Sequence, residues 1–107
     1  MIQLTKQKCE ACEGGVPPLT REEFTEYLPQ VKDWKVVEEM RLERNFVFRN
    51  FKEALKFVNA CGEIAEQEGH HPDLHISYGK VVVELSTHAI KGLSENDFIL
   101  AAKIDAL

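Results

Sequence analysis

The stretch LHISYGKVVVELST, residues 74–87, decides the fold that this sequence predicts. Two runs rich in β-branched residues flank Gly79-Lys80, and a two-residue loop with glycine first is typical of a type II′ β-hairpin. This loop sets the register, so that Tyr78 faces Val81. The pairs that follow on the same face are Ile76 with Val83 and Leu74 with Leu85. The hairpin is therefore expected to bury one continuous apolar face.

The other face of this hairpin is more polar and leads to the histidines. In the same register, His75 faces Glu84. Further along the ladder His71 falls opposite His88, although the intervening Pro72 cannot donate a ladder hydrogen bond. We therefore expect His71 and His88 at the same end of the hairpin.

The segment before the hairpin predicts a long helix over residues 51–68. Asn50 marks its start, and Gly69 is well placed as the left-handed residue that ends it. The last turn carries Glu66 and Glu68 but no basic residue, so its charge opposes the helix dipole. Apolar residues recur at the three- and four-residue spacing of a core-facing stripe, at Phe51, Ala54, Leu55, Val58, Cys61, Ile64 and Ala65.

Two further strands are predicted upstream of this helix. Residues 34–39 and 41–48 are short runs rich in aromatic and β-branched side chains, which favours an antiparallel hairpin with one buried face. Apolar residues alternate imperfectly along the second run, at Leu42, Phe46 and Phe48. Trp34 opens the first run, and we interpret it as packing area in or beside the core rather than as a ligand contact.

Helices are also predicted near both ends of the chain. Thr20 and Glu23 fit a capping box, and Pro29 ends the short helix that follows. Ser94 starts a helix over about residues 95–105, and capping is a sufficient explanation for Asp97 at its third position.

The element order α-β-β-α-β-β-α predicts an α+β fold in two layers, a four-stranded antiparallel sheet with three helices on one face. The second face of such a sheet and its open edges are often covered by another subunit. We therefore expect a homo-oligomer, either a dimer or a tetramer.

Length, composition and charge narrow the class of protein. The chain has 107 residues, of which 44% are hydrophobic and 29% charged, which fits one domain with one core. A formal charge of -5 without a basic stripe argues against nucleic-acid binding. Neither a membrane span nor a secretory signal is recognisable, so we expect a cytoplasmic protein. We predict an N-terminal tail over residues 1–18 and a domain over residues 19–107.

The cysteines give a weak signal. Cys9 and Cys12 form one C-x-x-C pair, whereas a structural zinc site requires four ligands and the chain has no second pair. The pair precedes a stretch rich in glycine and proline, not a helix start after a strand, which argues against a redox motif. We predict a mobile surface tail with two free thiols.

Three of the four histidines, His70, His71 and His88, are candidates for a functional site. Imidazoles transfer protons near neutral pH, and the acidic residues nearby favour their charged form. Metal binding is a second interpretation, but adjacent residues in an extended chain point to opposite sides, which makes His70 and His71 poor joint ligands. Purely structural histidines are a third. On the residues alone, all three interpretations stay open.

These histidines belong to a longer pattern in the second half of the chain. Its points are Glu66, the run His70-His71-Pro72, Tyr78, His88 and Asp97, with Leu-Ser-Thr-His at 85–88 and Gly-Leu-Ser-Glu at 92–95. Over about residues 20–105 the chain resembles the pterin-4a-carbinolamine dehydratase family.

The resemblance implies dehydration of a 4a-hydroxytetrahydropterin to the quinonoid dihydropterin and water, which recycles the pterin of aromatic amino-acid hydroxylases. It implies neither a metal nor an organic cofactor. By position it implies three catalytic histidines and three residues near the pterin, namely His70, His71 and His88, and Glu66, Ser86 and Thr87. Which imidazole is acid and which is base stays open, and our hypothesis is that His70 is the acid.

Animal members of this family also bind a transcription factor as a dimerisation cofactor. The resemblance therefore keeps a protein-interaction module with little or no catalysis as the alternative function. A pure binder has no physical need for three histidines, which favours the enzyme.

Overall fold

The computed structural model describes residues 3–10 and 16–107. Its helices are α1 (Arg21–Thr25), α2 (Phe51–Glu68) and α3 (Glu95–Asp105), and its strands are β1 (Lys35–Val37), β2 (Arg41–Val47), β3 (Asp73–Ser77) and β4 (Lys80–Leu85). Short 3₁₀ turns lie at Leu4–Lys6, Leu28–Gln30 and His88–Ile90. The predicted bounds of the long helix and of the last helix are confirmed. Within the described ranges, no helix combines the length and the apolar character that crossing a membrane requires.

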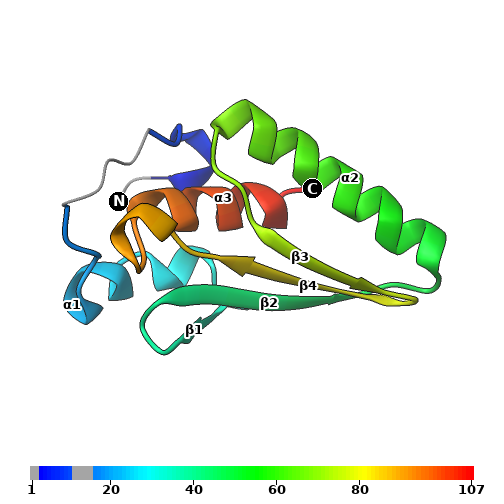
Figure 1. Cartoon of the computed structure of the whole chain (residues 1–107), viewed down its shortest axis with the longest axis horizontal. Coiled ribbons are helices and arrows are strands. Elements are labelled where there is room, and N and C mark those ends of the chain that lie inside the picture. Colours follow the sequence, from blue (N-terminus) through cyan, green and yellow to red (C-terminus); the bar gives the residue numbers. More distant parts are fainter. Residues whose placement is uncertain (1–2, 11–15) are drawn as a thin grey trace.

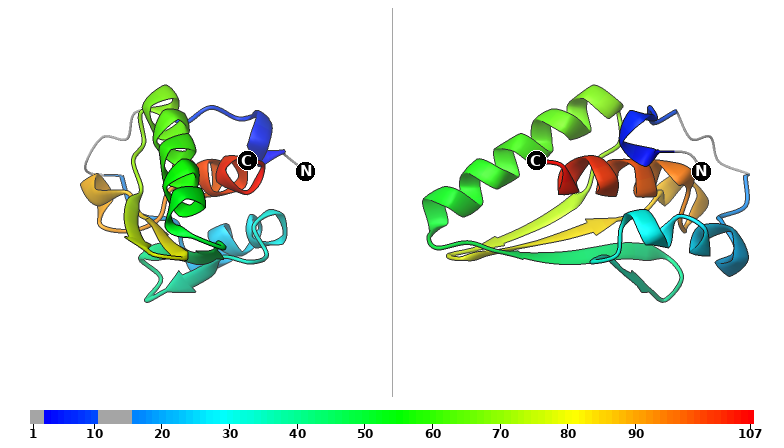
Figure 2. Two further views of the ribbon diagram at one scale, coloured as in Figure 1. Left: turned by 90° about the vertical axis from the view of Figure 1, so that its right-hand side faces the viewer. Right: turned by 180° about the vertical axis from the view of Figure 1, so that it is seen from behind.

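The strands form one antiparallel sheet in the order β1-β2-β4-β3, and α2 and α3 lie across one of its faces (Figure 1). Figure 2 shows the same two layers from the end and from behind. Strand β4 is central, and its helix-facing residues Val81, Val83 and Leu85 are fully buried. The predicted α+β fold, with four antiparallel strands and three helices, is confirmed.

The β3–β4 hairpin has the predicted faces but a different register. Ser77 pairs with Lys80, so the turn consists of Tyr78 and Gly79, and the predicted pairing of Tyr78 with Val81 is wrong. The slip moves each partner by two residues, and side chains alternate faces with a period of two. The predicted apolar set therefore still faces the helices.

A close backbone contact accounts for the position of the turn. The Phe48 amide donates to the carbonyl oxygen of Gly79 at 2.8 Å, and a Cβ atom on Gly79 would lie 2.8 Å from the Phe48 oxygen. Gly79 does not adopt the positive φ that a type II′ loop requires at its first position. The observed register also corrects the pairing of His71 with His88, because continuing it beyond the strands puts His71 level with Ser86.

Aromatic side chains join the long helix to the sheet. The ring centroids of Phe46 and Phe57 are 4.5 Å apart, and those of Phe48 and Phe57 are 5.1 Å apart. Trp34 is 4% exposed, and its indole Nε1 donates to Asp105 at 2.9 Å. The packing role predicted for Trp34 is confirmed.

The acidic end of α2 is held by groups from outside that helix. Gly69 ends the helix in the left-handed conformation, with φ of 65°, as predicted. The carboxylate of Glu68 pairs with Lys103 Nζ on α3 at 2.7 Å and accepts the Cys9 amide at 2.8 Å. Burial alone would raise the pKa of Glu68, but the Lys103 ammonium and the Cys9 amide hold it below its ordinary value.

Residues 3–10 differ from the surface tail that the sequence predicts. Leu4 is fully buried in the core, and its amide donates to Gln30 Oε1 at 2.9 Å. The Cys9 thiol is partly buried, and burial together with the Glu68 charge raises its pKa to about 12. Cys12, the other thiol of the predicted pair, lies outside the described residues. Residues 3–10 therefore pack against the domain, because the apolar side chain of Leu4 completes its core.

Replacing Glu68 with Gln should reduce stability near neutral pH by about 1–3 kcal/mol, the usual loss for a buried hydrogen bond to a charged group. The folded-state pKa of Glu68 lies below its ordinary value near 4.5, so the unfolded chain binds more protons. The stability that Glu68 contributes is thus fully present above that value and is lost as the pH falls through the lower folded-state pKa. Urea denaturation at about pH 7 and about pH 3 should show the difference from wild type shrinking at acid pH. Equal differences at both pH values would contradict this account.

Candidate active site

The chain reverses at Gly69 and brings the ends of α2, β3 and β4 together. A pocket of about 360 Å³ opens there, lined by residues 69–73 and 86–89. It gathers most of the predicted site residues, namely His70, His71, Ser86, Thr87 and His88. Glu66 lies one turn back along α2 and reaches this site through a hydrogen bond to His71. The fourth histidine, His75, does not line the pocket.

His70 points inward and meets a buried carboxylate. Its Nε2 lies 2.6 Å from Oδ1 of Asp97, whose side chain is fully buried. The other oxygen of Asp97 accepts the Thr87 hydroxyl at 2.9 Å and the Ser94 amide at 3.0 Å. Both oxygens of Asp97 are therefore engaged in hydrogen bonds inside the protein, and Nε2 is the ring nitrogen of His70 that shares a proton with this carboxyl group.

His71 points outward and has a different partner. Its Nε2 lies 2.5 Å from Oε2 of Glu66, and both side chains are more than half exposed. The two adjacent histidines therefore lie in different environments. One imidazole is held in a buried network and the other in a solvated pair.

His88 lines the pocket from the chain segment that follows β4. It begins the 3₁₀ turn that follows β4, and this turn closes where the Thr87 amide donates to the Gly92 oxygen at 2.8 Å. Lys91 adopts a left-handed conformation, with φ of 54°, to complete the turn. His88 itself is exposed at the rim of the pocket. The three histidines therefore come from two chain segments that only the fold brings together.

Asp97 is the site residue that capping alone did not identify. The predicted capping box is confirmed, because the carboxylate accepts the Ser94 amide. Capping uses one carboxylate oxygen and leaves the other free for His70. The available signal was the pattern itself, of which Asp97 is the last point.

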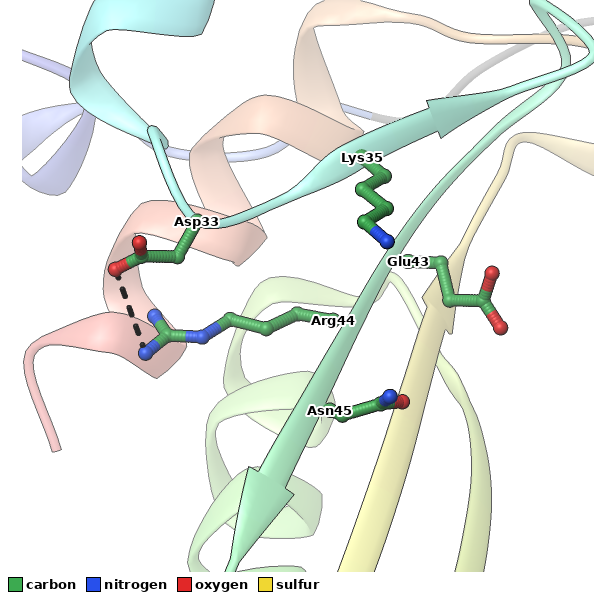
Figure 3. Close-up of a pocket in the computed structure, with 5 residues that line it drawn as sticks. All are labelled: Asp33, Lys35, Glu43, Arg44 and Asn45. Atoms are coloured by element: carbon green, nitrogen blue, oxygen red, sulfur yellow. Dashed lines mark ion pairs between the residues drawn. The ribbon is translucent and has the colours of Figure 1, made fainter.

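A second pocket, on the β1–β2 side of the sheet, has a different character (Figure 3). It has a volume of about 450 Å³ and is lined by Asp33, Lys35, Glu43, Arg44 and Asn45. Arg44 is bound to Asp33 at 3.6 Å and to Asp105 at 2.6 Å, and its guanidinium lies 4.4 Å from the centroid of the Phe46 ring. These contacts give Arg44 a structural explanation, and the lining holds no histidine. Among the described residues, no group of three or more potential ligands is arranged to hold a metal ion.

A model of the pterin 4 alpha carbinolamine dehydratase family matches residues 17–107. The chain belongs to this family. The match contains the three histidines of the pocket and both of their carboxylate partners.

Relatives that carry the name of this dehydratase match nearly the whole chain. One from Alkaliphilus metalliredigens is 51% identical over 98% of this chain and 96% of its own length. One from Rubrobacter xylanophilus is 49% identical over the full length of both. The crystal structure of a transcriptional coactivator/pterin dehydratase from Brucella melitensis has a TM-score of 0.78 and 33% identity, covering 83% of this chain and 96% of that one.

A more distant structure shares the fold alone. It is a pterin dehydratase-like protein identified as a RuBisCO assembly factor in the alpha-carboxysome. Its TM-score is 0.59 with 22% identity, covering 69% of this chain and 87% of that one.

Replacing Asp97 with Ala should lower the free energy of unfolding by about 2–4 kcal/mol, because a cap is lost and buried donors are left without an acceptor. Urea denaturation measures the loss. Glu23 is the matched control, since it is the acid of the exposed capping box of α1 and accepts the Thr20 amide at 2.9 Å. Its replacement with Ala should lose about 1 kcal/mol or less. Equal losses at the two positions would show that Asp97 is a cap and nothing more.

Proposed function

We propose that this chain dehydrates a 4a-hydroxytetrahydropterin to the quinonoid dihydropterin and so recycles the pterin used by an aromatic amino-acid hydroxylase. The observation that supports it is one pocket holding three histidines, two of them paired with carboxylates, in a member of this dehydratase family.

The reaction requires one proton donor and one proton acceptor. The bond between C4a and its hydroxyl breaks as that oxygen takes a proton, and N5 loses its proton as the N5–C4a double bond forms. Imidazoles can perform both transfers near neutral pH. A dehydration balanced in this way needs no oxidant and no reductant.

We assign the acid to His70. Asp97 holds its Nε2, which leaves Nδ1 as the ring nitrogen assigned to proton transfer with the departing hydroxyl. His71 and His88 are then the candidates for the base at N5. Both are exposed, so a proton taken from N5 can pass to solvent.

Three more residues are proposed to bind the pterin ring. Ser86 and Thr87 form the pocket wall at the end of β4, and Glu66 borders it beside His71. The Thr87 hydroxyl is already bonded to Asp97, so we assign the pterin contact of Thr87 to its backbone.

A protein-interaction role is the second candidate, and exposed apolar side chains favour it. Val47 and Tyr78 are 81% and 70% exposed at the hairpin end of the sheet, away from the histidine pocket. The Brucella relative is described as a coactivator as well as a dehydratase. The two roles would use different surfaces of the same fold.

Replacing His70, His71 or His88 with Ala should slow catalysed dehydration by about 10²–10⁴-fold, the usual loss for a general acid or base. The measurement follows the decay of chemically generated 4a-hydroxytetrahydropterin with and without protein. His75→Ala is the control, because His75 also pairs with a carboxylate, Glu84, at 2.7 Å but lies outside the pocket. If the wild-type chain does not accelerate this decay, the enzyme proposal is wrong and the protein-interaction role remains. Normal rates in His70→Ala would overturn the assignment of the acid.

We further expect the purified chain to form a dimer or a tetramer. Strand β3 is an edge strand whose residues are mostly exposed, and such edges are commonly covered. Light scattering during gel filtration should give a mass of two or four chains. Ile76→Lys, on this edge strand, should shift that mass toward one chain if the edge takes part. A wild-type protein that is monomeric at all concentrations would contradict the expectation.

A further inference from the structure

Residues 3–10 lie against the two helix ends that carry His70 and Asp97. The Cys9 amide donates to Glu68 at 2.8 Å, and Glu68 is the last residue of α2. The Glu10 amide donates to Asn96 Oδ1 at 3.0 Å, and Asn96 Nδ2 donates back to the Glu10 oxygen at 2.6 Å. Both figures of the whole chain show this segment beside the end of α2 and the start of α3. We call residues 3–10 the strap.

The strap is held by apolar burial as well as by polar bonds. Leu4 is fully buried within the main core. Glu68 and Asn96 are themselves nearly buried, with 6% of the Glu68 side chain and 9% of Asn96 exposed. If the strap moved away, buried polar groups would lose partners, which is unfavourable. The strap therefore has one preferred position on the two helix ends.

The bond between His70 and Asp97 needs this kind of support. It joins residues from separate segments, and both members lie close in sequence to residues that bind the strap. Asn96 directly precedes Asp97, and Glu68 lies two residues before His70. The ion pair between Glu68 and Lys103 is a second tie between the same two helices. A small separation of α2 from α3 would therefore lengthen the bond between His70 and Asp97.

Pro18 and Leu19, further along the N-terminal part of the chain, contact the turn that begins at His88. The Leu19 amide donates to the Leu93 oxygen at 2.8 Å. A Cβ atom on Gly92 would lie 2.6 Å from Pro18, so the two residues are in close contact. Gly92 closes the turn that begins at His88. The described N-terminal residues thus contact every element that supplies a histidine to the pocket.

We propose that Asn96 and Glu68 are positioning residues, and that the strap bound to them fixes the distance between His70 and Asp97. The proposal rests on the proposed function, in which His70 is the acid. It gives the Cys9 end of the C-x-x-C pair a structural role. The Cys9 thiol donates to the Asn96 backbone oxygen at 3.5 Å, and its amide binds Glu68.

The test removes strap contacts and leaves the pocket lining unchanged. Asn96→Ala deletes both side-chain bonds to Glu10, and Leu4→Ala weakens the apolar anchor. Both variants should lower kcat by about tenfold or more while KM stays within about twofold, because a misplaced acid weakens the transition state more than substrate binding. Leu4→Val removes less of the side chain and takes the place of Leu4→Ala if that variant does not fold.

A spectroscopic measurement reads the same bond without substrate. The Nε2 proton of His70, shared with a carboxylate, should give a downfield proton resonance, assigned by its disappearance in His70→Gln. We expect this resonance to weaken or vanish in Asn96→Ala. The control is Val81→Ala, a fully buried change at the far end of β4, which should destabilise the fold and leave both the resonance and kcat unchanged.

The outcomes separate this proposal from the proposed function. An unchanged resonance and an unchanged kcat in Asn96→Ala would overturn the positioning proposal. An equal loss of both in Val81→Ala would also overturn it. If the wild-type chain does not dehydrate the pterin, the proposed function fails and the resonance alone decides. Its loss in Asn96→Ala then supports the positioning role, and its retention rejects it.

Discussion

The buried carboxylate of Asp97 is the constraint on which both fold and site depend. It binds His70 from the turn after α2, Thr87 from the end of β4, and the backbone of Ser94 at the start of α3. A buried carboxyl group is strongly unfavourable unless its oxygens are hydrogen-bonded. The three segments must therefore arrive together, and the position of the inward histidine is set by the same bonds that hold the layers in place.

Two neighbouring histidines obtain unlike surroundings from this arrangement. His70 is bonded in the interior, while His71 pairs with Glu66 in solvent. The fold supplies that difference within one dipeptide, and His88 adds a third imidazole from a distant part of the chain.

Sequence reasoning succeeded where a feature depended on local chemistry. The bounds of α2 followed from Asn50, the apolar stripe and Gly69, and the last helix followed from its capping box. It failed where a distant contact decided the outcome. The β-turn moved by one residue because Phe48 bonds to Gly79.

The candidate site divides in the same way. The pocket collects the histidines that the pattern singled out, because they flank one hairpin end. The second oxygen of Asp97 could not be assigned from helix capping, since its partner lies far away in the chain. Leu4 gave no signal either, because the few apolar residues at the start of the chain show no sustained periodicity.

The positions of the two histidines depend on how many residues separate them from the left-handed turn at Gly69. Residues 70–72 join that turn to the start of β3 at Asp73, and the two adjacent histidines in this short connection bind partners on different sides, Asp97 and Glu66. Inserting or deleting one residue there would move the histidines relative to Asp97 while leaving every side chain chemically intact. We therefore expect this connection to tolerate substitutions better than insertions or deletions. The number of residues between Gly69 and β3 therefore matters to this pair of histidines as much as the residue types do.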